Sequence, residues 1–251
     1  MRWTDLRGRL RTWEKRNRGG CARLPMRHWL WATGFSGTAV LVAVTAGWPA
    51  GSETVIDPAR VTHARTALVS LTVLPARPPH DEAYSREAFG QAWTDTAPVA
   101  GAGNGCDTRN DVLARDLSVN GAVAVTSCRE AVASGRFRSP YTGREIVFTR
   151  GRGSTAVQID HIVPLSYAWD MGASAWPPQQ RTAFANDPAN LLATDAASNQ
   201  AKSDLEPGRW MPELRGFWCQ YAIQFIDVAD AYRLSVDEAS RRVLATALGE
   251  C

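Results

Sequence analysis

A long apolar run separates the start of the chain from the rest. Residues 29–48 contain no charged side chain, and about 20 residues at 1.5 Å each are long enough to cross a bilayer. Basic residues precede the run and few follow it, so residues 1–28 are expected to stay in the cytoplasm. The run is either a signal anchor or a signal peptide that is cleaved at the small residues Val44-Thr45-Ala46. The signal peptide would have an ordinary length if translation started at Met26. Both alternatives export residues 50–251. A third alternative, a buried core helix, would not explain why basic residues precede the run and few follow it.

The remaining pattern predicts a linker followed by one mixed domain. Proline, alanine and threonine dominate residues 49–80, which predicts a linker in which residues 67–74 form a short strand or helix. Residues 81–251 then form the folded domain. Apolar periodicity and capping residues predict helices at 81–94, 107–117, 176–185, 198–205, 217–232 and 235–248, and strands at 144–149, 156–161 and 190–194.

Two of these strands and the helix after them carry polar residues that suit phosphodiester chemistry. Asp160 and His161 stand at the exit of one strand, Asn190 opens the next, and Asn199 and Lys202 lie on the following helix. His161 can act as a general base, because its ordinary pKa lies near neutrality. Asp160 and Asn199 offer oxygen ligands that suit a hard cation such as Mg²⁺. Asn190 can accept a hydrogen bond from the His161 ring and fix its tautomer, and Lys202 can contact a phosphate.

Each of these residues alone also has a purely structural explanation. A single Asp-His pair is weak evidence, His161 could be a satisfied core histidine, and Asn190 and Asn199 could be turn or capping residues. Together, however, Asp-His-Ile-Val-Pro, Asn-Leu-Leu and Asn-x-x-Lys-Ser-Asp occur in the order and spacing of the HNH nuclease motif. The joint pattern favours the functional interpretation.

The resemblance extends beyond the motif at 156–204. From about Tyr84 to Cys251 the chain resembles exported HNH endonuclease family proteins of actinobacteria. These are related to the C-terminal nuclease domain of GmrSD-type modification-dependent restriction enzymes. The residues that carry the resemblance outside the motif are Phe89-Gly90, Trp93, Cys106-Asp107-Thr108-Arg109-Asn110, Pro140-Tyr141-Thr142-Gly143, Ala168-Trp169, Phe184-Ala185-Asn186-Asp187 and Trp210-Met211-Pro212.

This resemblance implies a fold and a division of labour within the site. The fold is α+β, with a ββα-metal core wrapped by helices and preceded by one N-terminal hydrophobic helix. His161 and Asn190 are then catalytic residues, Asp160 and Asn199 hold a divalent metal, and the product carries a 5′-phosphate. Mg²⁺ is the metal most expected. Many HNH enzymes have histidine where this chain has Asn199, so Mn²⁺ or another transition metal remains an alternative.

Cysteine use agrees with export. Cys21 lies in the basic tail, and the exported part contains four further cysteines, an even number that is typical of an oxidising compartment. Four cysteines allow three connectivities, of which we favour the sequential pairs Cys106–Cys128 and Cys219–Cys251. By the loop-entropy model each bridge contributes roughly 3 kcal/mol to stability.

Charge is divided unevenly along the chain. Residues 1–28 hold nine Lys and Arg against two acidic residues, whereas residues 29–251 hold nineteen against twenty-three, which is a net charge of −4. The exported part is therefore not a general polyanion-binding surface. A local exception is the basic arm at 136–152, which carries five arginines, including Arg150 and Arg152, against one glutamate. The arm is either a solvated hairpin or a contact with the phosphate backbone.

We therefore expect a metal-dependent HNH endonuclease that hydrolyses nucleic-acid phosphodiester bonds outside the cytoplasm. DNA is favoured over RNA, and little sequence specificity is expected because no reading helix is evident. The protein is expected to be secreted, or anchored to the membrane through residues 29–48, and no protein partner is evident. One alternative is a non-catalytic cell-surface binding domain on the same scaffold. Another is a phosphodiesterase for a different extracellular polyanion, an alternative that the net negative charge keeps open.

Overall fold

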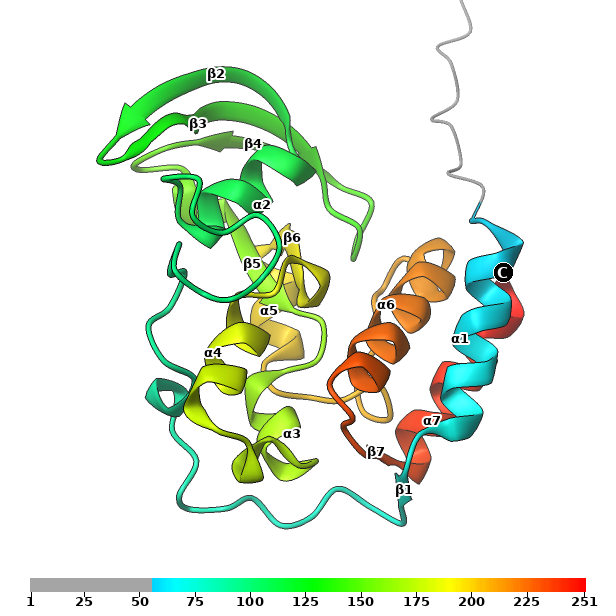
Figure 1. The fold of residues 1–251 in the computed structure, drawn as a ribbon. Helices are drawn as coiled ribbons and strands as arrows, with labels where there is room; N and C mark the ends of the chain where they lie inside the picture. The colour runs from blue at the N-terminus through cyan, green and yellow to red at the C-terminus, as the bar shows by residue number, and fades with distance from the viewer. Residues whose placement is uncertain (1–55) are drawn as a thin grey trace, which may run out of the picture. The chain divides into compact units, whose positions relative to one another are not determined.

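A computed structural model of the protein describes residues 56–251 (Figure 1). The hydrophobic helix expected at 29–48 and the basic tail before it lie outside these residues. Within the described part, none of the helices has the length and apolar character needed to cross a membrane.

The described residues form a mixed α+β structure, as the sequence predicted. The helices are α1 (Pro58–Ser70), α2 (Thr108–Asp116), α3 (Leu165–Asp170), α4 (Pro178–Asn186), α5 (Ala196–Lys202), α6 (Trp218–Ala231) and α7 (Glu238–Ala247). The strands are β1 (Val73–Leu74), β2 (Ser118–Val125), β3 (Cys128–Arg138), β4 (Glu145–Thr149), β5 (Val157–His161), β6 (Leu191–Asp195) and β7 (Val236–Asp237).

The strands form three small sheets. β2, β3 and β4 make an antiparallel sheet, and β1 pairs with β7 in parallel. β5 and β6 form an antiparallel pair in which Val157 lies opposite Asp195 and His161 lies opposite Leu191. α5 follows β6 without a connecting loop and contacts both strands. The order strand, strand, helix that the motif predicts is therefore present at β5, β6 and α5.

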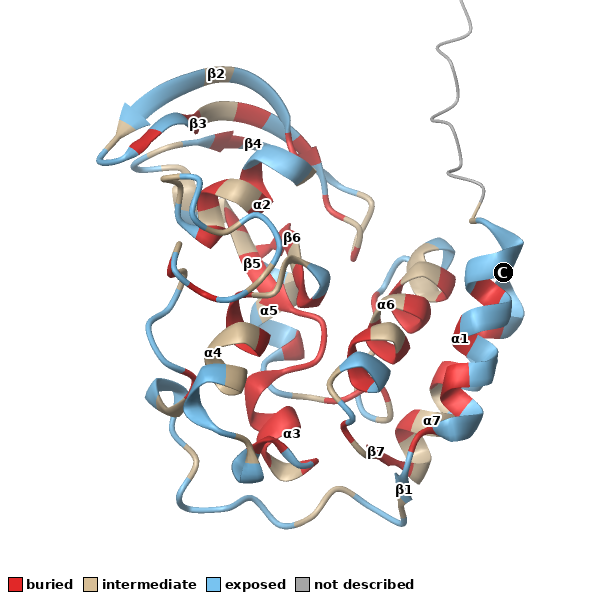
Figure 2. Cartoon of the chain, in the orientation of Figure 1, coloured by how far each residue is buried: buried red, intermediate tan, exposed pale blue. Residues whose placement is uncertain are grey.

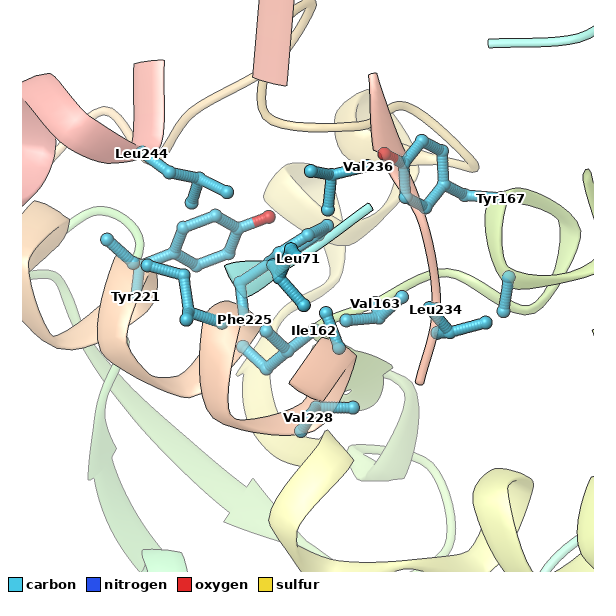
Figure 3. Close-up of a cluster of buried hydrophobic side chains, with 14 of the residues drawn as sticks. Leu71, Ile162, Val163, Tyr167, Tyr221, Phe225, Val228, Leu234, Val236 and Leu244 are labelled. Atoms are coloured by element: carbon cyan, nitrogen blue, oxygen red, sulfur yellow. The ribbon is translucent and has the colours of Figure 1, made fainter. Parts of the chain in front are cut away.

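The larger apolar core surrounds helix α6. This helix is apolar on most of its circumference, which requires burial on more than one side, and it packs against α1 and α7. Tyr221, Phe225 and Val228 of α6 lie in one cluster with Ile162 and Val163, the residues that follow β5 (Figure 3). The buried positions accordingly line the inner sides of α1, α6 and α7 (Figure 2).

A smaller core lies between α2, the three-stranded sheet and the β5–β6 pair. Leu113 of α2, Phe148 of β4 and Ile159 of β5 are among its members, together with Leu191 of β6. Because side chains alternate along a strand, Val157 and Ile159 face this core while Gln158 and Asp160 face the other way. The exit of β5 thus lies where the two cores meet.

Part of the expected linker is instead folded. Helix α1 buries Val61, Ala64 and Leu68 in the larger core. Farther along, Arg77 donates to Asp170 at 2.7 Å and to Glu206 at 3.1 Å, which fixes this segment to α3 and to the residues after α5. The alanines that predicted a linker instead include Ala64 and Ala67, which are buried where α1 packs against the core.

Two local predictions are wrong, and one hairpin was not predicted. Residues 81–94 form no helix beyond a short 3-10 turn at Arg86–Phe89, which Gly90 ends at a φ of 81°. The hairpin of β2 and β3 was not predicted, although Val119, Val123 and Val125 alternate along β2; most of this strand is exposed. Helix α7 is capped by Asp237, whose side chain accepts from the Ser240 amide, so the expected capping box starting at Ser235 does not form.

Both predicted disulfide bonds are confirmed. Cys106 pairs with Cys128, which joins the loop before α2 to the start of β3, and Cys219 pairs with Cys251. The second bridge connects α6 to the last residue of the chain, 32 residues farther on.

Loss of the second bridge should destabilise the fold measurably. We expect Cys251→Ser to lower the free energy of unfolding by about 2–5 kcal/mol, because the unfolded chain gains the entropy of an open loop. Urea unfolding monitored by tryptophan fluorescence measures this change. The double variant Cys219→Ser/Cys251→Ser is the control, since it breaks the same bridge and should lose no more than the single variant. A change below about 1 kcal/mol in Cys251→Ser would contradict a stabilising role.

Candidate active site

Strand β5 and helix α5 position the polar motif residues by their own periodicities. Gln158 and Asp160 are two residues apart on β5 and share one face of the strand. Asn199 and Lys202 are three residues apart on α5 and share one face of the helix. The two faces meet: Asn199 Nδ2 donates to Gln158 Oε1 at 2.7 Å, and Lys202 Nζ donates to Asp160 Oδ1 at 3.0 Å. Strand and helix are therefore joined by two side-chain pairs.

Asp160 is buried and bonded to two other side chains. Its side chain is 5% exposed, and Lys202, its partner, is fully buried. The Tyr141 hydroxyl donates to Asp160 Oδ2 at 2.6 Å, and Lys202 Nζ also donates to the His161 carbonyl oxygen at 2.8 Å. Burial, reinforced by Asp160, raises the pKa of Tyr141 well above its ordinary value, so the phenol keeps its proton and donates it. Asp160 is thereby held in a buried position by Tyr141 and Lys202.

The His161 ring has a defined tautomer. Its Nε2 lies 2.9 Å from the carbonyl oxygen of Ala185, which can only accept, so Nε2 carries the hydrogen and Nδ1 has a free lone pair. Burial lowers the pKa of His161 from 6.5 to about 3; the Ala185 carbonyl opposes this shift, whereas Arg86 and Lys202 add to it. The ring is therefore neutral near pH 7, with Nδ1 available to accept a hydrogen bond, and the low pKa makes it a weaker base than the near-neutral value expected from the sequence.

Asn190 does not contact the His161 ring, which corrects the sequence-based expectation. Its side chain is fully buried, and Oδ1 accepts from the Val163 amide at 2.9 Å while Nδ2 donates to the Val163 carbonyl at 3.3 Å. The Asn190 carbonyl oxygen accepts from the Ile162 amide at 2.8 Å. Asn190 thus fixes the backbone just after His161, and the Ala185 carbonyl has the role that was expected of the Asn190 side chain.

Asp160, His161 and Asn199 line one cleft of about 250 Å³. The Asn199 side-chain Nδ2 donates to Gln158, whereas its side-chain Oδ1 accepts no hydrogen bond from residues 56–251. Among residues 56–251, no three His, Cys, Asp or Glu side chains gather closely enough to hold a metal ion. One carboxylate and one amide oxygen fit Mg²⁺ in donor chemistry, because this ion keeps several of its waters and needs few protein ligands.

Lys202 cannot contact a phosphate in this arrangement. Its ammonium group is fully buried and bonded to Asp160 and to the His161 carbonyl. Burial lowers the pKa of Lys202, and the Asp160 carboxylate opposes that shift. Lys202 is therefore a structural counter-charge for Asp160, and not the phosphate contact that the sequence predicted.

Most arginines of the basic arm bond to other groups of the protein. Arg152 is exposed and forms no hydrogen bond or ion pair with the described residues, so it alone keeps a free guanidinium. The phosphate contact expected of Arg150 is corrected, because its guanidinium is held within the fold. The engaged pairs are Arg136 with Glu145, Arg138 with the Gly143 carbonyl, Arg144 with Glu213, and Arg150 with Asn110 and the Val132 carbonyl.

Sequence reasoning missed three residues of the site. Tyr141, in the turn after β3, bonds to Asp160, and Gln158, on β5, bonds to Asn199. Arg86, on the short 3-10 turn, lines the cleft. Gln158 lies two residues before Asp160, and strand alternation could have identified it. Arg86 has no such signal, because its segment has no regular periodicity.

Comparison with known proteins is consistent with this geometry. Residues 107–247 match the family of GmrSD restriction endonuclease C-terminal domains, and the chain belongs to this family. It is similar to a protein of Arthroderma benhamiae named an uncharacterized secreted protein, with 38% identity over 219 residues that cover 85% of this chain and 97% of the relative. No solved structure matches the chain.

The structural role of Lys202 can be tested by stability. Lys202→Met should lower the free energy of unfolding by about 3–5 kcal/mol, because it leaves the Asp160 carboxylate buried without its counter-charge. Urea unfolding gives the value. The double variant Asp160→Asn/Lys202→Met is the matched control and should recover part of the loss, since neither charge then remains buried. An unchanged unfolding midpoint in Lys202→Met would show that the lysine is available for a substrate instead.

Proposed function

We propose that this protein is a metal-dependent HNH endonuclease and that β5, β6 and α5 form its ββα-metal core. The observation that carries the proposal is the combination of three groups within one cleft: the His161 ring with an unprotonated Nδ1, the buried side chain of Asp160, and the unbonded side-chain Oδ1 of Asn199. Membership of a nuclease-domain family supports the same conclusion. These groups match what hydrolysis of a phosphodiester by water requires, namely a base and oxygen ligands for a cation.

The chain's own residues have separate tasks in this proposal. His161 takes a proton from the attacking water at Nδ1, and the Ala185 carbonyl keeps the ring oriented for that transfer. Asn190 is a positioning residue, because it fixes the backbone after His161 and does not touch the reacting atoms. Arg86, an exposed guanidinium on the same cleft, supplies the phosphate contact that the buried Lys202 does not.

A divalent cation completes the proposed chemistry. Asp160 and Asn199 would hold it, and when bound it supplies the positive charge that phosphoryl oxygens need as negative charge develops on them. Tyr141 and Lys202 keep the Asp160 carboxylate in place for this purpose. Mg²⁺ is proposed first and Mn²⁺ as the alternative, because both donors are oxygens.

The proposed substrate is nucleic acid, and the proposed location is outside the cytoplasm. DNA is favoured over RNA, and little sequence specificity is expected because the sequence shows no evident reading helix. Two disulfide bonds and the secreted relative support export. Anchoring through residues 29–48 remains a proposal from the sequence.

The base assignment predicts a large loss of activity in one variant. His161→Ala should lower nuclease turnover by at least about 10²-fold, because the attacking water loses its proton acceptor. Initial rates of plasmid nicking measure this change. His63→Ala is the matched control, since His63 is exposed on α1. Cleavage by His161→Ala within a few-fold of the unmodified protein would rule out His161 as the base.

The ligand assignment predicts a change in metal dependence. Asn199→Ala should raise the Mg²⁺ concentration that gives half-maximal cleavage, because one oxygen ligand is lost, whereas Asn199→Asp should not raise it. Gln200→Ala, at an exposed neighbouring position of α5, is the control. Identical metal titrations for Asn199→Ala and the unmodified protein would place the ion elsewhere.

A further inference from the structure

A second hollow adjoins the cleft on the other side of His161. It has a volume of about 180 Å³ and shares Arg86, His161 and Leu165 with the cleft. Its character is different, because apolar and aromatic groups dominate the remainder of its lining. These groups are Phe89, Gly90, Ala92, Trp93 and Ala185, with Glu87 as the other charged residue.

The hollow is preformed by tight packing. Gly90 has a φ of +81°, and a Cβ there would lie 2.3 Å from Thr182 Oγ1, so only glycine allows the turn to approach α4 this closely. Phe89 is almost fully buried and packs against Phe184 of α4 with ring centroids 6.1 Å apart. The wall formed by residues 86–90 is therefore fixed before any ligand arrives.

Trp93 occupies a strained position in this hollow. Its φ is +57°, a conformation that bulky side chains adopt rarely and that tends to occur at functional sites. Its ring lies nearly parallel to the His161 ring, with 17° between the planes and 5.9 Å between the centroids. The Trp93 carbonyl is held by the Thr108 amide at 3.3 Å. The fold thus keeps a partly exposed indole next to the residue proposed as the base.

Arg86 connects the two hollows. It is exposed, and within residues 56–251 its guanidinium forms no hydrogen bond or ion pair with another protein group. It lines the polar cleft and the apolar hollow at once, so a single side chain can contact a phosphate in one and the edge of a ring in the other. Glu87 adds an acceptor at the same rim.

We propose that the hollow lined by Trp93 and Phe89 is a nucleobase subsite that receives the base next to the scissile phosphate. The inference rests on the proposed nuclease function. A flat ring with polar edges suits an aromatic wall bordered by Arg86 and Glu87. A base enters such a hollow only when it is unstacked and unpaired, so the preferred substrate is a single strand or an unpaired position in a duplex.

The test compares two single strands that differ only in their bases. One is an oligonucleotide with ordinary bases, and the other carries stable tetrahydrofuran abasic residues throughout. The unmodified protein should cleave the first about ten-fold faster, since stacking of one base is lost in the second. Equal rates on both strands would overturn the subsite while leaving the nuclease function intact. Cleavage of neither strand would overturn the nuclease function as well.

Variants locate the effect. Trp93→Ala removes an aromatic wall, and Ala92→Trp fills the hollow from an exposed position, so both should bring the ratio of the two rates close to one. Val69→Trp adds a tryptophan at an 88% exposed site on α1 and should keep the ratio of the unmodified protein. Circular dichroism checks that each variant is folded. A ratio unchanged in both Trp93→Ala and Ala92→Trp would place base recognition elsewhere and overturn the proposal.

Discussion

The buried ion pair between Asp160 and Lys202 fixes the geometry of the cleft. Lys202 reaches Asp160 and the His161 carbonyl from α5, and Tyr141 reaches Asp160 from the turn after β3. These bonds hold β5, α5 and that turn in one relative position. Charges removed from water in this way are costly unless each has its partner, so the three elements depend on one another. The Asn199 side chain, one helical turn before Lys202, is thereby placed beside β5.

This arrangement means that Asp160 has two tasks. Its carboxylate balances Lys202 within the fold, and it also borders the cleft in which we propose a cation binds. A carboxylate oxygen has more than one lone pair, so the bonds from Tyr141 and Lys202 do not by themselves exclude a further ligand. They do fix the direction in which Asp160 points. In the proposed function, the free energy spent on burying this charge is offset by an Asp160 side chain that is already oriented toward the cation.

Sequence periodicity predicted the parts of the site that lie on regular elements. The β5 and β6 strands and a helix after them were predicted, although α5 begins at Ala196 and not at Ser198. For α2 the sequence offered Asp107 or Thr108 as the cap, and Asp107 is the residue that forms it. Roles that depend on burial were not predictable in the same way. A lysine on a short polar helix is usually exposed, so the sequence alone indicated a phosphate contact for Lys202. The Ala185 carbonyl has no sequence signal, because every residue carries one.

The irregular segment at 84–94 was the least predictable part. Its apolar residues suggested a helix, but Gly90 and the positive φ of Trp93 break the chain into short turns. Only the tertiary structure shows that these turns bring Arg86 and Trp93 to the same hollow beside His161. Loops carry much of the function in enzymes for this reason: their side chains are positioned by the surrounding elements and not by local periodicity.

The most direct test of the central claim is plasmid cleavage by the unmodified protein with controlled metal. Supercoiled DNA should be converted to nicked and linear forms in Mg²⁺, conversion should stop in excess EDTA, and it should resume when Mg²⁺ is restored. Full conversion in excess chelator would contradict the metal site at Asp160 and Asn199. No conversion with any divalent cation, on DNA or on RNA, would contradict the nuclease itself.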